Sequence, residues 1–279
     1  MTRRRLAGAV VVVAGGALAI LGGGVVLGPL ARPTPTVALG PPRFIDDTAS
    51  SGVAHTYAGR FPFSVGGGVA AFDCDGDGRP DLYFAGGSGP ATLYRNESSV
   101  GGPLRFTKIA DPATDLRGVT GAYPIDLDGD GKVDLMVLRD GENIALRGLG
   151  GCRFERANAA WGLDGGASFT TAFSATWEGP ATLPTIAFGN YVADPENPDP
   201  NHLCADNELI RPVAGTGRYG VPIPLTPSWC ALSMLFSDWD RSGRRDLRVS
   251  NDRHYYSDLS DGQEQLWRIA PGQPPRQYT

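Results

Sequence analysis

Short apolar runs separated by acidic or glycine-rich turns make up most of the chain. The first run of each repeating group leads into an acidic loop, at Val69–Phe72, Ala122–Ile125 and Met234–Phe236. A second run leaves each loop, at Leu82–Phe84, Leu135–Leu138 and Leu247–Val249. Runs of this length between glycine turns are typical of β-strands, because an amphipathic helix needs a longer stretch. The pattern therefore predicts antiparallel β-sheet and no long helix after residue 31.

Each group continues with further short runs. A third run lies at Thr92–Arg95, Ile144–Arg147 and Gln265–Arg268. A fourth run opens with an Arg-Phe pair at Arg43-Phe44, Arg105-Phe106 and Arg153-Phe154. Four short strands in a repeat of about 50 residues are typical of a propeller blade. The predicted fold class is all-β, a β-propeller of which about four blades are present.

The acidic loops share a nine-residue pattern. The first loop reads Asp73-Cys74-Asp75-Gly76-Asp77-Gly78-Arg79-Pro80-Asp81, with aspartates at positions 1, 3, 5 and 9. The pattern recurs in full from Asp126 to Asp134. It recurs in weakened form from Asp238 to Asp246, where Ser242 stands at position 5. Repetition at long spacing indicates a repeating fold that carries the same loop in each unit.

A degenerate unit fills the long gap between the second and the last acidic loop. Asp73 and Asp126 lie 53 residues apart, whereas 112 residues separate Asp126 from Asp238. Within that gap, residues 172–177 match the run that enters the first loop, and residues 185–189 match the run that leaves it. The ligand positions of this third unit hold Trp177, Gly179, Ala181 and Thr185. We expect this unit to have lost the metal and kept its strands.

Two other folds could carry acidic loops of this kind. A β-sandwich is the first alternative, and the regular spacing of the units favours a propeller over it. An EF-hand or dockerin is the second, and its loop needs an acidic residue at position 12. Position 12 is Phe84, Val137 or Val249 in the three loops, each within an apolar run. The sequence therefore excludes the helical calcium motifs.

Closely spaced carboxylates repel one another unless a cation lies between them. Oxygen ligands in a flexible loop suit calcium, which takes six to eight oxygens at about 2.3–2.6 Å, better than magnesium, which requires an octahedron. We expect Ca²⁺ in a structural role, bound by side chains at positions 1, 3, 5 and 9 and the carbonyl of position 7. These residues are Asp73, Asp75, Asp77, Arg79 and Asp81; Asp126, Asp128, Asp130, Lys132 and Asp134; and Asp238, Asp240, Ser242, Arg244 and Asp246. The last site should bind most weakly, because a serine removes one charge.

The segment Phe72-Asp73-Cys74-Asp75-Gly76-Asp77-Gly78-Arg79-Pro80-Asp81-Leu82-Tyr83 resembles an FG-GAP/VCBS repeat, as found in integrin α-subunit propellers. Residues 44–49, 93–96 and 250–253 extend the similarity to the ASPIC/UnbV group, related to cartilage acidic protein. The resemblance covers about residues 43–270. It implies a seven-bladed propeller with calcium in loops between blade strands. Four units, and the missing C-terminal module of that group, leave open a closed ring of four blades, an incomplete ring or a fragment.

The N-terminus predicts export. Arg3, Arg4 and Arg5 precede an uncharged stretch over residues 6–31 that is long enough to span a bilayer of about 30 Å. The arginines would stay cytoplasmic, which places the rest of the chain outside. Residues 1–31 are therefore a signal peptide or a signal anchor with a hydrophobic helix, and membrane contact is expected only there. Residues 32–42 form a proline-rich linker, and residues 43–279 carry the repeats.

Four cysteines suit the oxidising environment outside the cytoplasm. Three pairings are possible, as are free buried thiols. We favour Cys204–Cys230, because these cysteines flank much of a proline-rich insertion over residues 194–229. Cys74–Cys152 is then the remaining pair. The insertion is also the best candidate for a recognition loop, although it could equally be a loop held by its disulfide without a binding role.

No catalytic pattern is visible in the sequence. The histidines His55, His202 and His254 lack metal-site or catalytic spacing, and there is no nucleophile elbow or phosphate-binding loop. A net charge of −5 without a basic patch argues against nucleic acid as a partner. We therefore expect an extracellular or cell-surface calcium-binding adhesion or scaffold module, not an enzyme, that binds a protein or glycan. The alternative is a polysaccharide-active, lyase-like or enzyme-accessory propeller.

Overall fold

The computed structural model describes residues 40–41, 43–179, 182–193, 204–252 and 262–278, together with the backbone of two short strands before them. The chain divides into two compact units, Met1–Ile45 and Asp46–Thr279. Its described residues are all-β apart from three short helical segments. These are α1 (Thr48–Ser51), the 3₁₀ helix η1 (Phe63–Val65) and α2 (Asn158–Trp161).

The first unit shows only two short strands. β1 (Ala19–Leu21) pairs antiparallel with β2 (Gly24–Val26). Most of the predicted hydrophobic helix over residues 6–31, and most of the predicted linker over residues 32–42, lies outside the described residues. Among the described residues, no helix has the length and apolar character needed to cross a bilayer. The export segment therefore stays a prediction.

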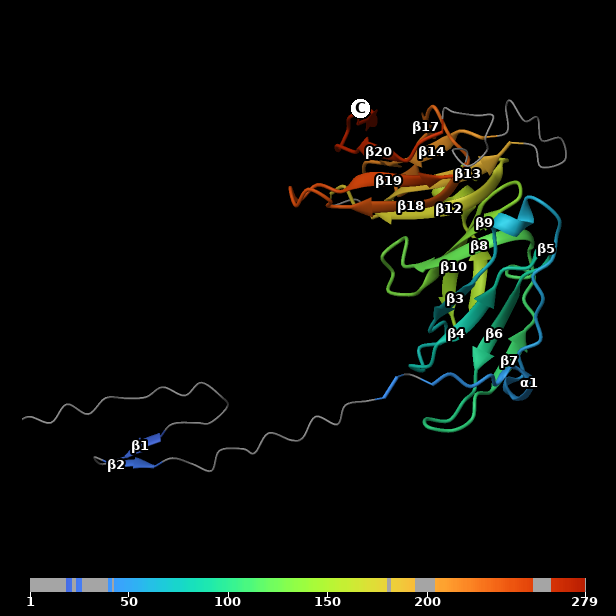
Figure 1. Cartoon of the computed structure of the whole chain (residues 1–279), viewed down its shortest axis with the longest axis vertical. Helices are drawn as coiled ribbons and strands as arrows, with labels where there is room; N and C mark the ends of the chain where they lie inside the picture. The colour runs from blue at the N-terminus through green and yellow to red at the C-terminus, as the bar shows by residue number, and fades with distance from the viewer. Residues whose placement is uncertain are drawn as a thin grey trace, which may run out of the picture. The chain divides into compact units, whose positions relative to one another are not determined.

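The second unit contains four antiparallel sheets of four or five strands that follow one another in the sequence (Figure 1). Sheet 1 contains β3 (Val69–Phe72), β4 (Asp81–Phe84), β6 (Thr92–Asn96) and β7 (Phe106–Ile109). Sheet 2 contains β8 (Arg117–Ile125), β9 (Asp134–Arg139), β10 (Ile144–Gly150) and β11 (Arg153–Arg156), with β5 (Gly87–Pro90) added beside β8. Sheet 3 contains β12 (Phe169–Thr176), β13 (Thr185–Val192), β14 (Asn207–Ile210) and β17 (Ile223–Leu225). Sheet 4 contains β18 (Ala231–Ser237), β19 (Asp246–Asn251), β20 (Gln265–Arg268) and β21 (Arg276–Gln277).

Most predicted strands coincide with observed ones, including those of the degenerate third unit. The Arg-Phe pair at residues 43–44 is an exception, because it forms no strand and Phe44 is 93 % exposed. A fourth strand pairs with the third strand of its own sheet, and no such strand precedes Arg43 in the described part of the chain. The prediction of a strand at this pair was therefore wrong.

The predicted insertion over residues 194–229 is partly sheet. Its described portion supplies β14 and β17, the last two strands of sheet 3, and the hairpin of β15 (Pro212–Val213) and β16 (Arg218–Tyr219). Only residues 194–203 of the predicted insertion lie outside the described residues. The prediction of one long recognition loop was wrong in this respect, because sheet 3 takes its third and fourth strands from this stretch.

Neighbouring sheets pack face to face, which is a propeller-like arrangement of blades. One core cluster joins sheets 1 and 2 around Tyr83 and Val137. A second joins sheets 2 and 3 around Met136 and Phe188, and a third joins sheets 3 and 4 around Ala187. The two faces of each middle strand therefore belong to different cores. This explains why β9 and β13 are almost wholly buried and show no polar alternation.

The outer faces of sheet 1 and sheet 4, at the two ends of the stack, differ in whether other residues cover them. The segment before η1 covers sheet 1: the rings of His55 and Phe84 lie 5.1 Å apart, and the Tyr94 hydroxyl donates to the Ala54 carbonyl at 2.7 Å. On the outer face of sheet 4, Leu235 is 58 % exposed, and Arg248 is exposed beside it. Sheet 4 therefore offers an open surface.

Both disulfides of the favoured pairing are present. Cys74–Cys152 joins the first acidic loop to the turn between β10 and β11, and Cys204–Cys230 joins the stretch before β14 to the start of β18. The bridges span 78 and 26 residues. Loops of these lengths correspond to about 4.5 and 3.5 kcal/mol in the chain-entropy model. Two disulfides are consistent with an extracellular protein.

The face-to-face packing predicts a large loss of stability for Phe188→Ala. Phe188 is fully buried between sheets 2 and 3. Truncation should leave a cavity and lower the free energy of unfolding by about 3–5 kcal/mol. Urea denaturation measures this loss. The matched control is Leu235→Ala on the open face of sheet 4, where a change within about 0.5 kcal/mol is expected; equal losses in the two variants would contradict the stacking.

Candidate functional site

Each acidic loop connects the first two strands of its sheet. The residue before the loop pairs with position 9 across the strands, as Phe72 pairs with Asp81 and Ile125 with Asp134. Ser237 and Asp246 form the same pair in sheet 4. The antiparallel register therefore places position 9 at the start of the second strand and brings it back beside the loop.

The loop backbone is folded around the carboxylate at position 1. Asp73 accepts hydrogen bonds from the amides of Gly76 at 2.7 Å and Gly78 at 2.8 Å. Asp126 accepts the equivalent bonds from the amides of positions 4 and 6 at 2.8 and 3.0 Å. Glycine is needed at position 6, where φ is +82° in Gly78 and in Gly131. The two loops are therefore built on the same hydrogen-bond plan.

The carboxylate at position 9 is buried and holds two strands together. Asp81 accepts from the Cys74 amide at the start of the loop and from the Asn96 amide at the end of β6, both at 2.8 Å. Asp134 accepts from the amides of Leu127 at 2.7 Å and Gly148 at 2.8 Å. Each of these aspartates is 0 % exposed. A single buried side chain therefore ties the loop to the third strand of its sheet.

The first two loops bring three carboxylates together. Ligand oxygens of positions 1, 3 and 9 lie within 4.8 Å of one another in each loop. These groups are Asp73, Asp75 and Asp81, and Asp126, Asp128 and Asp134. An oxygen-only group of three carboxylates suits a hard cation such as calcium. No third acidic group of this kind forms among the residues that the structure describes.

Position 5 lies outside these groups, although the sequence predicts it as a ligand. Asp77 pairs with Arg79, and Asp130 pairs with Lys132 at 2.9 Å between Oδ2 and Nζ. Arg147 of β10 adds a second cation at the second loop, with Nε 2.8 Å from Asp128. The ligand roles of Asp77 and Asp130, and of the carbonyls of Arg79 and Lys132, remain predictions.

Burial and like charge dominate the electrostatics of the first two loops. Burial raises the pKa of Asp134 to about 6, and the neighbouring Asp128 and Asp126 raise it further against the hydrogen bonds from the amides. Burial likewise raises the pKa of Asp81, with Asp75 adding to the effect. A cation among these carboxylates would favour their charged forms and reverse both shifts.

The third loop has a different construction. The indole of Trp177 donates to the Thr182 carbonyl at 3.3 Å, and Thr185 takes the buried place of the position-9 aspartate. The register of β13 and β14 puts Pro212 where Asn96 and Gly148 stand in the first two sheets. Proline has no amide hydrogen to donate, so an aspartate at residue 185 would lack one of its two partners. Ala181, a predicted ligand position, lies outside the described residues.

The fourth loop also departs from the first two. Asp238 accepts from the Gly243 amide at 3.0 Å, as position 1 does elsewhere. Arg244, however, bonds to the buried Asp246. Burial acts to raise the pKa of Asp246, but hydrogen bonds from Arg244, Tyr278, the Ile269 amide and Trp239 outweigh it and lower the pKa to about 2. The guanidinium of Arg244 therefore lies among the residues of the predicted weak calcium site.

The first two loops meet at a common depression between sheets 1 and 2. A cavity of about 280 Å³ is lined by Asp73 and Asp75 from the first loop and by Lys132 from the second. Cys74 also lines this cavity, so the disulfide to Cys152 fastens the first loop beside the second. The candidate metal loops are therefore parts of one inter-sheet junction.

A comparison with protein families places the same stretch in a known repeat. Residues 73–137 match the FG-GAP-like repeat. This chain contains an FG-GAP-like repeat. The match begins at the first residue of the first acidic loop and ends within β9. It therefore spans both carboxylate groups and the strands between them. A search of the curated proteins gives no match.

The comparisons and the structure leave several predicted features open. The FG-GAP-like repeat supports the repeat resemblance, whereas nothing confirms the ASPIC/UnbV group. Of the histidines, His55 contacts the Ala85 carbonyl at 2.7 Å, and His202 and His254 lie outside the described residues.

The sequence reasoning missed Arg147 and the inward position of Arg244. The available signal for Arg147 was its place at the end of an apolar run. For Arg244 it was the nearby serine in place of the aspartate at position 5.

Asp134 predicts a pH dependence of stability in EDTA. Its folded-state pKa of about 6 lies above the ordinary value of 3.8, so its contribution is fully present below pH 3.8 and is lost as pH rises through 6. We expect a loss on the order of 2–3 kcal/mol between pH 4 and pH 7 from this group. Urea unfolding of the wild type and of Asp134→Asn, both in EDTA, measures the difference. Parallel pH profiles for the two proteins would contradict the assignment.

Proposed function

We propose that this protein is an exported, calcium-stabilised propeller module that binds or scaffolds extracellular partners. The observation that carries the proposal is the group of three carboxylates that recurs in the first two acidic loops. Two loops with the same hydrogen-bond plan and the same buried aspartate favour one shared structural role.

Calcium fits the residues of the first two loops. Asp73, Asp75 and Asp81 would hold the ion in the first, and Asp126, Asp128 and Asp134 in the second. The ion would supply positive charge between carboxylates that otherwise repel. Extracellular modules bind calcium at about 10⁻⁴–10⁻³ M. At a free concentration of ten times the Kd, each site would add about 1.4 kcal/mol, which suits structural stabilisation.

Several features support the finer parts of the proposal. Two disulfides favour an oxidising compartment, and the arginines before an uncharged stretch favour a signal peptide or signal anchor. The FG-GAP-like repeat and the four stacked sheets favour a propeller. Similarity at residues 44–49, 93–96 and 250–253 favours the ASPIC/UnbV group. We propose these assignments together as the cellular and family setting of the module.

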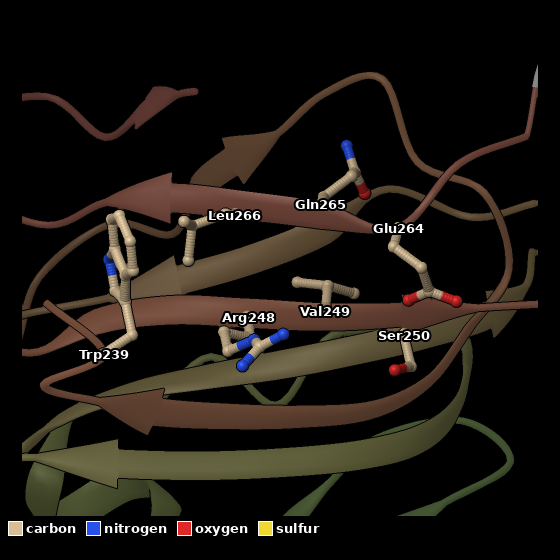
Figure 2. Close-up of a pocket in the computed structure, with 7 residues that line it drawn as sticks. All are labelled: Trp239, Arg248, Val249, Ser250, Glu264, Gln265 and Leu266. Carbon is tan, nitrogen blue, oxygen red and sulfur yellow. The ribbon is translucent and has the colours of Figure 1, made fainter. Parts of the chain in front are cut away.

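A glycan is the partner class that one surface favours. A groove of about 310 Å³ lies on the outer face of sheet 4 (Figure 2). Trp239 stands at one end, Glu264 and Ser250 lie at the other, and Arg248 lies between them (Figure 2). A half-exposed indole beside polar and charged side chains suits the apolar face and the hydroxyls of a sugar. The same groove would serve the alternative function, a polysaccharide-active or enzyme-accessory propeller.

Calcium is predicted to raise the melting temperature, because it neutralises the buried carboxylates. Differential scanning calorimetry in EDTA and in millimolar calcium should show a rise of about 3–8 °C for two sites. The double variant Asp73→Asn/Asp126→Asn should lose most of this rise. Asp115→Asn, an exposed aspartate outside the loops, is the matched control and should keep it. A melting temperature that is indifferent to EDTA and calcium would disprove the metal assignment.

The groove predicts glycan binding that depends on Arg248. Polysaccharide pull-down and isothermal titration should show binding that Arg248→Ala weakens by about tenfold, equal to the loss of one charged hydrogen bond. Arg276→Ala removes an exposed cation outside the groove and should leave binding unchanged. Product analysis in the same samples separates binding from cleavage. Equal binding by the two variants would disprove the groove assignment.

A further inference from the structure

The fourth loop keeps the length of the first two loops but changes two of the residues that those loops share. Ser242 replaces the aspartate at position 5, and Arg241 replaces the glycine at position 4. Arg241 nevertheless keeps the left-handed backbone of that glycine, with φ of +59°. Position 7 remains cationic, as Arg244, in the place of Arg79 and Lys132. The loop has therefore kept its shape while losing a charge.

The cation at position 7 points outward in the first two loops. Arg79 and Lys132 pair with the aspartate at position 5, and these two cations are 39 % and 47 % exposed. The buried Asp81 is left with backbone amides as its donors. Its remaining lone pairs face the other carboxylates of the group, which is the arrangement that a metal ion needs.

The cation at position 7 turns inward in the fourth loop, where Ser242 offers no carboxylate. The Nε atom of Arg244 lies 3.0 Å from Oδ1 of Asp246, and Nη2 lies 3.3 Å from Oδ2. Nη2 also lies 3.3 Å from Oδ2 of Asp240, at position 3. One guanidinium therefore contacts two of the positions that are grouped around a common point in the first two loops. Arg244 is only 27 % exposed.

Other donors complete the shell of Asp246. The Tyr278 hydroxyl donates to Oδ2 at 2.7 Å, and the Trp239 indole donates to the same oxygen at 3.1 Å. The Ile269 amide donates to Oδ1 at 3.1 Å. Together with Arg244, these groups place five donor contacts on the two oxygens. A carboxylate so engaged has no lone pair free for a metal ion.

We propose that the guanidinium of Arg244 takes the place of the metal ion in the fourth loop, which is therefore closed without calcium. The residues of this loop do not fit calcium as those of the first two loops do. An internal ion pair replaces the calcium site that the sequence predicts between Asp238 and Asp246. Only the contrast between the fourth loop and the first two loops rests on the proposed calcium binding. The closure by Arg244 stands on the contacts within the fourth loop.

The third loop uses a related device. Arg211 holds Glu178 with Nε 2.8 Å from Oε1 and Nη2 3.3 Å from Oε2. The same guanidinium donates to the carbonyls of Ala270 and Gln273 at 3.1 and 2.8 Å. Arg211 therefore fastens the third loop to the turn between β20 and β21 of sheet 4. The second loop differs in one respect: Arg147 contacts Asp128 and Asp130 there but leaves the buried Asp134 to backbone amides.

The first test compares the loops of the full chain by hydrogen–deuterium exchange. Adding calcium to the EDTA-treated protein should slow exchange in residues 73–81 and 126–134 at least fivefold. Exchange in residues 238–246 should change less than twofold. Calcium protection of residues 238–246 equal to that of the first two loops would overturn the proposal.

The second test uses Arg244→Gln, which removes the charge and keeps most of the side chain. Loss of the cation beside buried Asp246 should lower the melting temperature by about 5 °C or more, equally in EDTA and in calcium. Arg79→Gln is the matched control, because its ion pair is exposed; a change of about 1–2 °C is expected. Equal effects of the two variants would overturn the proposal. This comparison in EDTA holds even if the first two loops bind no calcium.

The third test converts the fourth loop to the pattern of the second. The triple variant Arg241→Gly/Ser242→Asp/Arg244→Lys restores an aspartate at position 5 and a short cation at position 7. Isothermal titration should show two calcium sites in the wild type and three in this variant. Three sites in the wild type would overturn the proposal. No heat in either protein would count against calcium binding in the first two loops, and Arg244→Gln would then decide the role of Arg244 alone.

Discussion

A buried carboxylate at position 9 of the loop is the constraint on which each metal-type unit depends. Asp81, Asp134 and Asp246 are fully buried, and each accepts a hydrogen bond from a backbone amide in the last part of the third strand or just beyond it. That bond fixes the third strand against the turn between the first two. The hydrogen bond fixes the geometry of the strands, but burying the carboxylate takes a negative charge out of water, which lowers the stability of the fold. Something in each unit must offset that charge.

The units differ in how the charge is offset, and the differences follow from single residues. The first two units place further carboxylates around the buried aspartate, a combination that suits a bound cation. The third unit has Pro212 where a donor amide is needed, and Thr185 brings no charge to offset. The fourth unit keeps the aspartate and supplies Arg244 from its own loop. A loss of charge at position 5 thereby frees the cation at position 7 to turn inward.

The strands were predictable because their pattern is local. Apolar runs before and after each loop appear in the sequence at almost the residues where β3, β8 and β18 end and β4, β9 and β19 begin. Even the third unit could be found, since its runs keep their spacing after the acidic residues are lost. The strands of sheet 3 after residue 193 could not, because Asn207–Ile210 and Ile223–Leu225 lack the acidic loop that marks a unit.

Side-chain direction was the part of the site that the sequence could not supply. Arg79, Lys132 and Arg244 occupy the same position, and the nine-residue pattern assigns all three the same backbone role. Their side chains differ in direction because position 5 is an aspartate in the first two loops and Ser242 in the fourth loop. That consequence depends on distances across the loop, which no spacing rule contains. The pairing of Cys74 with Cys152, by contrast, followed from elimination once Cys204 and Cys230 were assigned to each other.

The outer face of sheet 4 limits how the stack can continue. The interfaces between neighbouring sheets are lined on both sides by apolar residues such as Met136 and Phe188. The outer face of sheet 4 instead places Arg248 and Ser250 between apolar positions on β19. A further blade on this face would take the guanidinium of Arg248 out of water, at a cost of several kcal/mol unless a partner met it. A polar partner such as the proposed glycan would instead leave Arg248 hydrogen-bonded.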